Sequence, residues 1–201
     1  MDIGDGVCDA VPIYEGYSLP HAIVRLDLAG RDLTDHMIKL LDPLFHCTTP
    51  ADREAVQEMK EKLCYVALDY EAEKLRAAPE QVYQLPSGQL ISVGNERFMC
   101  PEGLFRPSLL GSDVRGVHEC TFSSISKCDM EIRGNMYANV VLSGGSTMFG
   151  GFGGRLCREL GFLAGKREVV KVVERPDRLY LGWIGGAILT SLPAFQQMWI
   201  S

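Results

Sequence analysis

"MDIGDGVCDA" occupies residues 1–10 and places a glycine turn, Gly4-Asp5-Gly6, directly before an apolar segment that continues to Tyr14. An Asp-Gly turn of this kind normally joins the two strands of a hairpin. Residues 7–14 read as the strand that follows the turn. So few residues precede the turn that we expect its first strand to be missing.

A second glycine turn follows a buried strand much later in the chain. In residues 139–150, NVVLSGGSTMFG, an apolar run ends at Gly144-Gly145, and a helix then continues through residues 155–160. Glycine lets backbone N–H groups approach a phosphate or ribose, and a helix N-terminus carries partial positive charge. Two such turns favour a nucleotide site, although a Gly-Gly pair alone is more often only a tight connection. Neither a Walker-type motif nor a dinucleotide glycine fingerprint is present.

Charged residues near these turns are candidates for binding roles. Asp2 and Asp5 flank the first turn, where carboxylates often hold Mg²⁺ beside a phosphate, but Asp is also an ordinary turn residue. Lys60 and Glu61, at a helix end, are candidates for ribose and base contacts, although a solvated charged face is the commoner explanation. We interpret the four histidines as structural, since none has a catalytic partner at a telling spacing: His21, His36, His46 and His118.

The composition limits the classes of protein that this chain can belong to. With 201 residues, 46% of them hydrophobic, it can form one large domain or two small ones. A net charge of -6 and the lack of a basic run argue against nucleic-acid binding. We expect no membrane span and no signal peptide, and therefore a cytosolic protein. The seven cysteines have no Cys-x-x-Cys spacing and are expected to be reduced and mostly buried.

Strand and helix patterns alternate along the chain, which predicts an α/β fold. The expected strands are residues 7–14, 22–28, 64–69, 139–142 and 169–173, with a hairpin of 82–85 and 89–93 across Pro86-Ser87-Gly88. Helices are expected from residue 31, over 50–63 with Thr49 as the cap, and over 70–78, 121–128 and 155–160. Residues 106–113 read as an exposed loop that carries Leu109 and Leu110, and residues 183–186 as a turn.

Longer motifs resemble a known family. GDGV, VPIYEGYSLPHAIVRLDLAGRDLTD, EKLCYVALDYE, GNERFMCPE, LFRPSLLG, YANVVLSGGSTMFGG, WIGGAILTSL and FQQMWIS occur in this order. Together they resemble the actin family over residues 2–201. The resemblance implies the actin/Hsp70 ATPase-like (ribonuclease H-like) α/β fold, in which two lobes clasp a nucleotide and a divalent cation.

The resemblance also implies how the chain is divided. Residues 1–28 and 113–179 would form the inner subdomain of one largely retained lobe, and residues 29–112 its outer subdomain. Residues 180–201 would be a remnant of the opposite lobe, which is mostly missing. Gly4–Val7 resembles the second phosphate hairpin of the family. The family's first phosphate hairpin, the glutamine that places the attacking water, and the C-terminal helix have no counterpart in this sequence.

The expected cofactor is ATP or ADP with Mg²⁺ or Ca²⁺, and the resemblance assigns residues to it. Asp2 and Asp5 would lie near the metal. The nucleotide-binding positions would be Gly4, Asp5, Gly6 and Val7 at phosphate, Gly30, Lys60 and Glu61 at the ribose and base, Gly144, Gly145 and Ser146 at the sugar and α-phosphate, and Met148 and Phe149 at adenine.

Several residues differ from the family pattern, which weakens the expectation of catalytic activity. Asp9 stands at the position of the water-placing histidine, and a carboxylate beside a polyphosphate adds repulsion. Leu179 replaces a lysine near the adenine, and Gln57 replaces an arginine of the base pocket. Residues 150–154 are glycine-rich where the family has a proline-containing helix start. We therefore expect weakened nucleotide binding, and ATP hydrolysis is not expected of this chain alone.

Two functional readings remain open at this point. The first is an actin-family cytoskeletal protein, similar to a filament subunit, with a partial ATP-binding cleft. The alternative is a truncated actin-like product without hydrolysis, which only binds or caps actin or has no settled function. Leu109 and Leu110 would contact a partner, because exposed apolar loop residues commonly mark an interface. The expected partners are actin, actin-binding proteins and a cytosolic chaperonin, and the expected location is the cytoplasm and cytoskeleton.

Overall fold

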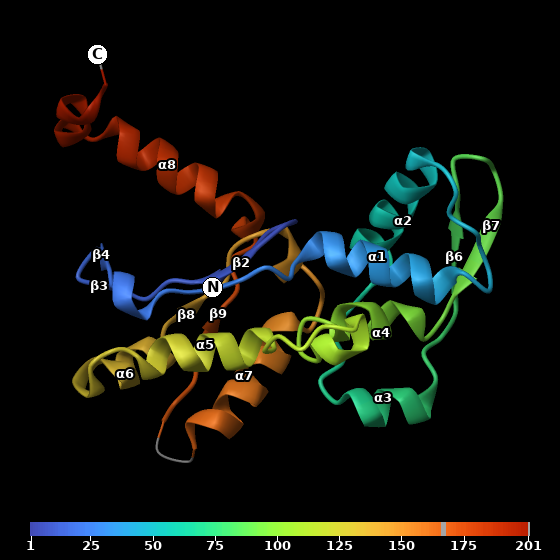
Figure 1. Cartoon of the computed structure of the whole chain (residues 1–201), viewed down its shortest axis with the longest axis horizontal. Helices are drawn as coiled ribbons and strands as arrows, with labels where there is room; N and C mark the ends of the chain where they lie inside the picture. The colour runs from blue at the N-terminus through green and yellow to red at the C-terminus, as the bar shows by residue number, and fades with distance from the viewer. Residues whose placement is uncertain (166–167, 201) are drawn as a thin grey trace.

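A short antiparallel sheet lies at the centre of the computed structural model, which describes residues 1–165 and 168–200 (Figure 1). Its strands are β1 (Asp2–Ile3), β2 (Cys8–Ala10) and β5 (Val24–Leu26), in the order β1-β2-β5. β1 pairs with β2 across the first glycine turn, with Asp2 opposite Asp9. The expectation that the first strand of this hairpin is missing is therefore wrong, because two residues are enough to form the pair.

A second, parallel pair extends this sheet on the other side of β1. β8 (Val140–Val141) pairs with β9 (Val172–Val173). The Ile3 N–H donates to the Ser143 carbonyl over 2.9 Å, and the Ser143 N–H donates to the Met1 carbonyl over 2.9 Å. The strands therefore follow one another in space as β9, β8, β1, β2 and β5, and both glycine turns lie at the ends of adjacent strands.

Helices cover the sheet and enclose the core. α5 (Val117–Ser126), α6 (Met130–Tyr137) and α7 (Phe152–Ala164) lie together on one side of the central strands (Figure 1). The sequence pattern predicts a helix over 121–128, and α5 partly matches it, whereas α6 was not predicted. Between β8 and α7 the second glycine turn forms a short 3-10 helix, η3 (Gly145–Thr147). The core here is fully buried and includes Ile3, Leu142, Phe152, Leu156 and Leu160.

The second group of elements lies beside this layer (Figure 1). It comprises α1 (Gly30–Leu41), α2 (Pro50–Leu63), α3 (Tyr70–Arg76), α4 (Glu96–Glu102) and the hairpin of β6 (Gln81–Gln84) with β7 (Leu90–Val93). The expected cap of α2 is confirmed, because the Asp52 N–H donates to Thr49 Oγ1 over 3.1 Å and the Thr49 N–H donates back to Asp52 over 2.9 Å. The expected hairpin is also confirmed.

Three further local expectations are wrong. Residues 64–69 form no strand, only an isolated parallel bridge between Tyr65 and Gly150, and Asp69 already caps α3 by accepting the Ala72 N–H. Residues 7–14 are not one strand, because Pro12 interrupts β2 before β3 (Ile13–Tyr14) pairs with β4 (Tyr17–Ser18). Residues 183–186 lie inside a helix, α8 (Leu181–Ser191), and not in a turn.

The C-terminal segment extends away from the rest of the molecule (Figure 1). It consists of α8 and η5 (Pro193–Met198), and α8 buries none of its own residues. The preceding η4 (Arg178–Tyr180) stays with the rest of the molecule, because the Arg178 carbonyl accepts the Gly144 N–H over 3.0 Å. Trp183 is 78% exposed, for example. Among the described residues, no helix has the length and apolar character that crossing a membrane requires. The cysteines match expectation: all seven are free thiols and most are buried.

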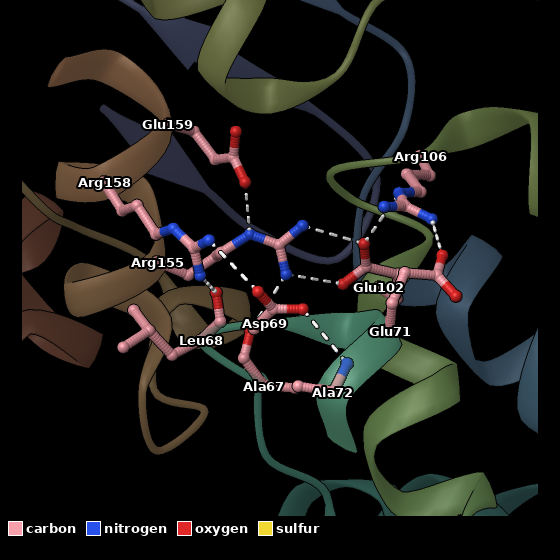
Figure 2. Close-up of polar contacts among 10 residues, drawn as sticks. All are labelled: Ala67, Leu68, Asp69, Glu71, Ala72, Glu102, Arg106, Arg155, Arg158 and Glu159. Atoms are coloured by element: carbon pink, nitrogen blue, oxygen red, sulfur yellow. Dashed lines mark hydrogen bonds and ion pairs between the residues drawn. The ribbon is translucent and has the colours of Figure 1, made fainter. Parts of the chain in front are cut away.

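A buried ion pair joins the two groups of elements (Figure 2). Arg155 of α7 donates to both carboxylate oxygens of Glu102 in α4, each over 2.9 Å, and to the Ala67 carbonyl over 2.9 Å. The two side chains are almost fully buried. Around them, Arg106 pairs with Glu102 and Glu71, and Arg158 pairs with Asp69. The position of α7 relative to α4 is therefore set by directional contacts as well as by packing.

Candidate functional site

A cavity of about 450 Å³ opens where the two glycine turns meet α1 and α2. This volume lies within the usual range of small-molecule sites, roughly 300–1,000 Å³. Most of the residues that the sequence assigned to a nucleotide line it, but Gly6, Val7 and Gly144 do not. The lining residues are Gly4, Asp5, Gly30, Gln57, Lys60, Glu61, Gly145, Ser146, Met148, Phe149 and Leu179.

The Gly4 carbonyl connects three segments at the inner end of the cavity. It accepts the Gly30 N–H over 3.1 Å and the Ser146 hydroxyl over 2.7 Å. A Cβ atom on Gly30 would lie 2.7 Å from the Ser146 Oγ, so only glycine fits there without displacing that side chain. The first hairpin, the start of α1 and the η3 turn are thereby held together as one surface.

Gly144 has a structural role next to this surface. Its φ is +90°, which favours glycine, and a Cβ atom on it would collide with the Ile3 carbonyl oxygen. Gly144 therefore lets the η3 turn pass close to β1. This close approach places Gly145 and Ser146 at the cavity.

Backbone N–H groups without partners gather at both glycine turns. Within the described part of the chain, the N–H groups of Asp5, Gly6 and Val7 at the hairpin tip make no hydrogen bond. The N–H groups of Gly145 and Ser146 begin η3 and have no partner inside it. Successive free N–H groups in a turn or at a helix start are a recurring binding arrangement for anions.

The Lys60 ammonium is already engaged in hydrogen bonds within the protein. Its ammonium donates to the Gly30 carbonyl over 2.7 Å and to Thr34 Oγ1 over 2.9 Å, and the residue is only 4% exposed. Burial lowers the pKa of this lysine. Lys60 therefore forms part of the cavity wall and holds α2 against the start of α1.

Polar and apolar side chains both line the cavity. The Gln57 side-chain amide donates to the Glu61 carboxylate over 3.0 Å. Met148 and Leu179 are exposed and Phe149 is buried, and these three residues form an apolar wall. The cavity thus combines free N–H donors with apolar surface, and Leu179 of that surface lies beside Gly145.

The carboxylates expected at a metal are not gathered at one point. Asp5 pairs with Arg31, whose Nη2 lies 3.1 Å from Asp5 Oδ2. Asp2 and Asp9 face each other in the β1–β2 register and line a different cavity. Among the described residues there is no group of three His, Cys, Asp or Glu side chains that could hold a metal ion. The carboxylates of this chain therefore do not form a cation site by themselves.

Arg31 is a candidate site residue that was not predicted from the sequence. It lies at the start of α1, its side chain is 67% exposed, and it contacts Asp5 at the hairpin tip. Its position directly after Gly30 was the one feature of the sequence that pointed to the site. The contact of Arg31 with the hairpin depends on how α1 packs against β1.

The loop of residues 106–113 differs from the expected exposed loop. Residues Pro107–Leu110 form a 3-10 helix, η2, which ends at Gly111 with a φ of +77°. Leu109 is 41% exposed, as expected. Leu110 is half-buried and packs on the core, because the tight turn directs it towards Gly103. Only one of the two leucines is therefore a surface residue.

The fold and the site are those of a mixed α/β protein in which two glycine turns bring free backbone N–H groups to one cavity. A family model described as Actin matches the chain over residues 1–45 and 44–201. These ranges span the chain, which therefore belongs to the actin family.

Proposed function

We propose that this actin-family chain is a cytoskeletal protein that binds an adenine nucleotide, ATP or ADP, in the 450 Å³ cavity. Members of the family generally bind a nucleotide with a divalent cation, Mg²⁺ or Ca²⁺. The observation that supports the proposal is that one cavity is lined by Asp5 of the first glycine turn and by Gly145 and Ser146 of the second, and all three residues have free N–H groups. The free N–H groups of Gly6 and Val7 follow that of Asp5 at the hairpin tip. Such donors match phosphate oxygens.

The residues of the cavity suggest how each part of the nucleotide is held. The free N–H groups would donate hydrogen bonds to the phosphate oxygens, and Arg31 would exchange part of its contact with Asp5 for a phosphate oxygen. The apolar wall of Met148, Phe149 and Leu179 would take the base. A bound cation would neutralise phosphate charge beside the hairpin tip. Asp5 is the hairpin carboxylate that lines the cavity and could contact this cation.

We further propose that the chain alone does not hydrolyse ATP at a significant rate. Hydrolysis needs groups that are preorganised around the attacking water and the transferring phosphoryl group. Asp9, at the position of the water-placing histidine, lines a different cavity from the proposed phosphates. The rest of the fold would correspond to one lobe of the actin/Hsp70 ATPase architecture, with the subdomain boundaries given above.

Titration calorimetry with Mg-ATP tests this proposal. We expect a dissociation constant weaker than about 1 μM, because Lys60 is engaged within the protein and the carboxylates near the turns repel phosphate. Gly145→Val should weaken binding at least tenfold, since it places a branched side chain at the cavity beside Leu179. Gly154→Ala is the matched control, because Gly154 lies on α7 away from the cavity with open space around it.

Two results would contradict the proposal. Equal affinity of the parent chain and Gly145→Val would show that ATP binds elsewhere. A sub-micromolar affinity, or steady release of phosphate, would show that the site is far more complete than we propose.

A second candidate function is attachment to actin filaments through η2. Leu109 is an exposed apolar side chain on the 3-10 helix η2, and such residues commonly mark a contact surface. Cosedimentation with preformed actin filaments tests this function. Leu109→Asp should abolish pelleting, and Leu75→Asp, on the exposed side of α3, should leave it unchanged. Equal pelleting of both variants, or spontaneous filaments from the parent chain, would contradict a role as a non-nucleating binder.

Membership of the actin family suggests a cellular location and partners for this chain. The actin family is generally cytoskeletal, and we propose the cytoplasm and cytoskeleton as the location. The proposed partners are actin, actin-binding proteins and, during folding, a cytosolic chaperonin.

A further inference from the structure

The short helix η4 lies directly against the η3 turn at one wall of the candidate cavity. The Gly144 N–H donates to the Arg178 carbonyl over 3.0 Å. The next residue, Leu179, lines the cavity, and its Cδ1 would lie 3.3 Å from a Cβ atom on Gly145. Leu179 is therefore beside the turn whose N–H groups are free. The way in which η4 is fixed to η3 decides where this apolar side chain lies.

The Arg178 side chain makes that connection. Its Nε and Nη2 atoms donate to the Thr147 carbonyl over 3.3 and 3.2 Å, and Nη1 donates to the Arg175 carbonyl over 2.9 Å. Thr147 is the last residue of η3, and basic side chains commonly bond to the last carbonyl groups of a helix. The guanidinium is a planar fork, so several bonds from it fix orientation as well as distance.

Two further contacts hold the same region. Glu174 Oε1 lies 3.6 Å from Arg178 Nη2 and accepts the Gly153 N–H in the first turn of α7 over 3.3 Å. Within the η3 turn, Thr147 Oγ1 donates to the Gly144 carbonyl over 2.7 Å. Arg178 thus joins η3, η4 and the first turn of α7. Its side chain is only 12% exposed, so the guanidinium serves protein groups and not a ligand.

The result is a fixed spacing between two kinds of binding surface. The N–H groups of Gly145 and Ser146 suit an anionic group, and the exposed Leu179 side chain suits an apolar one. Both surfaces lie on turns that Arg178 ties together. A ligand therefore gains from both only if it carries an anionic and an apolar group close to one another. A nucleotide does so, whereas an inorganic polyphosphate offers the anionic group alone.

We infer that Arg178 is a positioning residue of the nucleotide cavity and acts through Leu179. It holds Leu179 at the distance from Gly145 and Ser146 at which one nucleotide contacts all three residues. Arg178 thereby sets the preference of the site for a nucleotide over a simple polyphosphate. This inference rests on the proposed nucleotide function.

Calorimetric titrations of the full chain with Mg-ATP and with tripolyphosphate, in the same magnesium buffer, test the inference. We expect the parent chain to bind Mg-ATP at least tenfold more tightly than tripolyphosphate. Arg178→Met removes the guanidinium and keeps a long apolar side chain, and it should weaken Mg-ATP binding at least fivefold. Its affinity for tripolyphosphate should change less than twofold, because the free N–H groups remain.

Arg175→Met is the matched control for lost charge. Arg175 lies three residues before Arg178 and carries the same charge, but its guanidinium is exposed and pairs with Asp177. Both affinities of this variant should stay within twofold of those of the parent chain. A long-range effect of charge would instead weaken both ligands in both arginine variants.

Substitutions at Leu179 show whether Arg178 acts through it. Leu179→Ala should weaken Mg-ATP binding about fivefold, because apolar contact is lost, and should leave tripolyphosphate binding unchanged. The double variant should bind Mg-ATP no more weakly than Arg178→Met alone, since residues that act through one contact are not additive. Arg178→Lys can still donate to the Thr147 carbonyl, and its affinity for Mg-ATP should fall between those of the parent chain and Arg178→Met.

Several results would overturn the inference and leave the nucleotide function standing. One is equal weakening of both ligands by Arg178→Met, or no change in either, because the spacing then has no part in selection. Another is a parent chain that binds tripolyphosphate as tightly as Mg-ATP. Where Arg178→Met fails to fold, an unchanged ratio of the two affinities in Leu179→Ala has the same meaning. A parent chain that binds neither ligand would remove the nucleotide function itself, and this inference with it.

Discussion

Lys60 is the residue whose contacts most change the interpretation of the candidate site. Its ammonium reaches back to the Gly30 carbonyl and Thr34 and not into free space, and its aliphatic stem is buried between α1 and α2. A buried lysine of this kind stabilises the cavity wall. It therefore affects the shape of the site more than the charge that a ligand meets.

Substitution of each of two lysines on α2 by alanine tests this role. Lys60→Ala should lower the free energy of unfolding by about 1–3 kcal/mol, because it removes buried packing and the donor to two oxygens. Lys62→Ala, two residues along the same helix, should change it by less than about 1 kcal/mol, since Lys62 makes only an exposed pair with Glu58. Urea unfolding measures both changes. Equal losses would show that the buried contacts of Lys60 contribute nothing.

His118 makes stability depend on pH. Its ring stacks on Phe105, with centroids 5.8 Å apart, and Nδ1 is buried with no partner within the described residues. Burial lowers the pKa of His118, with Arg155 acting in the same direction and Glu119 and Glu159 opposing it. Burial also lowers the pKa of His36, with Lys39 acting in the same direction. The unfolded chain therefore binds more protons than the folded chain once the pH falls through 6.5.

The free energy of unfolding should consequently fall between pH 7.5 and pH 5.5. In His118→Phe this dependence should be smaller, because the ring stacking is kept and the titrating group is removed. The carboxylates whose pKa values are lowered by hydrogen bonds, such as those of Asp52 and Asp69, lose their contribution only at more acidic pH, near and below 3.8. Chemical unfolding at the two pH values decides the matter, and an unchanged slope in His118→Phe would rule out this role.

At the scale of elements, α7 carries glycines with different physical roles. Gly151 precedes the helix with a φ of +84°, and a Cβ atom there would collide with the Val66 carbonyl. Gly153 is buried, and a Cβ atom on it would collide with the Glu174 side chain. Gly154 is exposed with open space around it. Only the last of these glycines is free to change.

Adjacent substitutions in α7 test this difference. Gly154→Ala should raise the free energy of unfolding by about 0.5–1 kcal/mol, which is the helix propensity that alanine gains over glycine. Gly153→Ala should gain less or lose stability, because the methyl group must displace Glu174. Thermal and urea unfolding of the two variants give the comparison. A larger gain for Gly153→Ala would contradict the described packing.

Elements with local signals were predictable from the sequence. The cap at Thr49, the Pro86-Ser87-Gly88 hairpin and the apolar run at 139–142 each follow from short-range chemistry, and all three are confirmed. Residues 64–69 and 183–186 were misread, because a short apolar run does not tell strand from helix or coil until its neighbours are placed. The cavity lining was largely expected, whereas the direction of Lys60 and the contact of Arg31 with Asp5 depend on helix packing.

At the scale of the whole molecule, the Glu102–Arg155 pair links α4 to α7 across the core (Figure 2). Both side chains are almost completely removed from water, and each has only one further, more exposed charged partner, Arg106 for Glu102 and Glu159 for Arg155. Loss of one member of the pair would leave the other buried charge only partly compensated. The arrangement of the two groups of elements, and with it the shape of the cavity between the glycine turns and α2, depends on this contact.

Three substitutions test the importance of this pair. Arg155→Leu should cost about 3 kcal/mol of unfolding free energy, because the buried Glu102 is left with only the half-exposed Arg106 as its charged partner. Replacement of both residues by leucine should cost clearly less, since no charge is then stranded. Arg158→Leu, at the half-exposed rim of the same network, should cost about 1 kcal/mol or less. A double variant as unstable as Arg155→Leu would show that lost packing, and not the stranded charge, sets the cost.

The most direct test of the central claim is a titration of the ¹⁵N-labelled chain with Mg-ATP, followed through its amide resonances. Our account predicts that the amides of residues 5–7 and of Gly145 and Ser146 shift together along one binding curve. Amides of α8, which lines no part of the 450 Å³ cavity, should stay in place. Shifts confined to other parts of the chain, or none at millimolar ATP, would contradict the claim that the two glycine turns form one phosphate site.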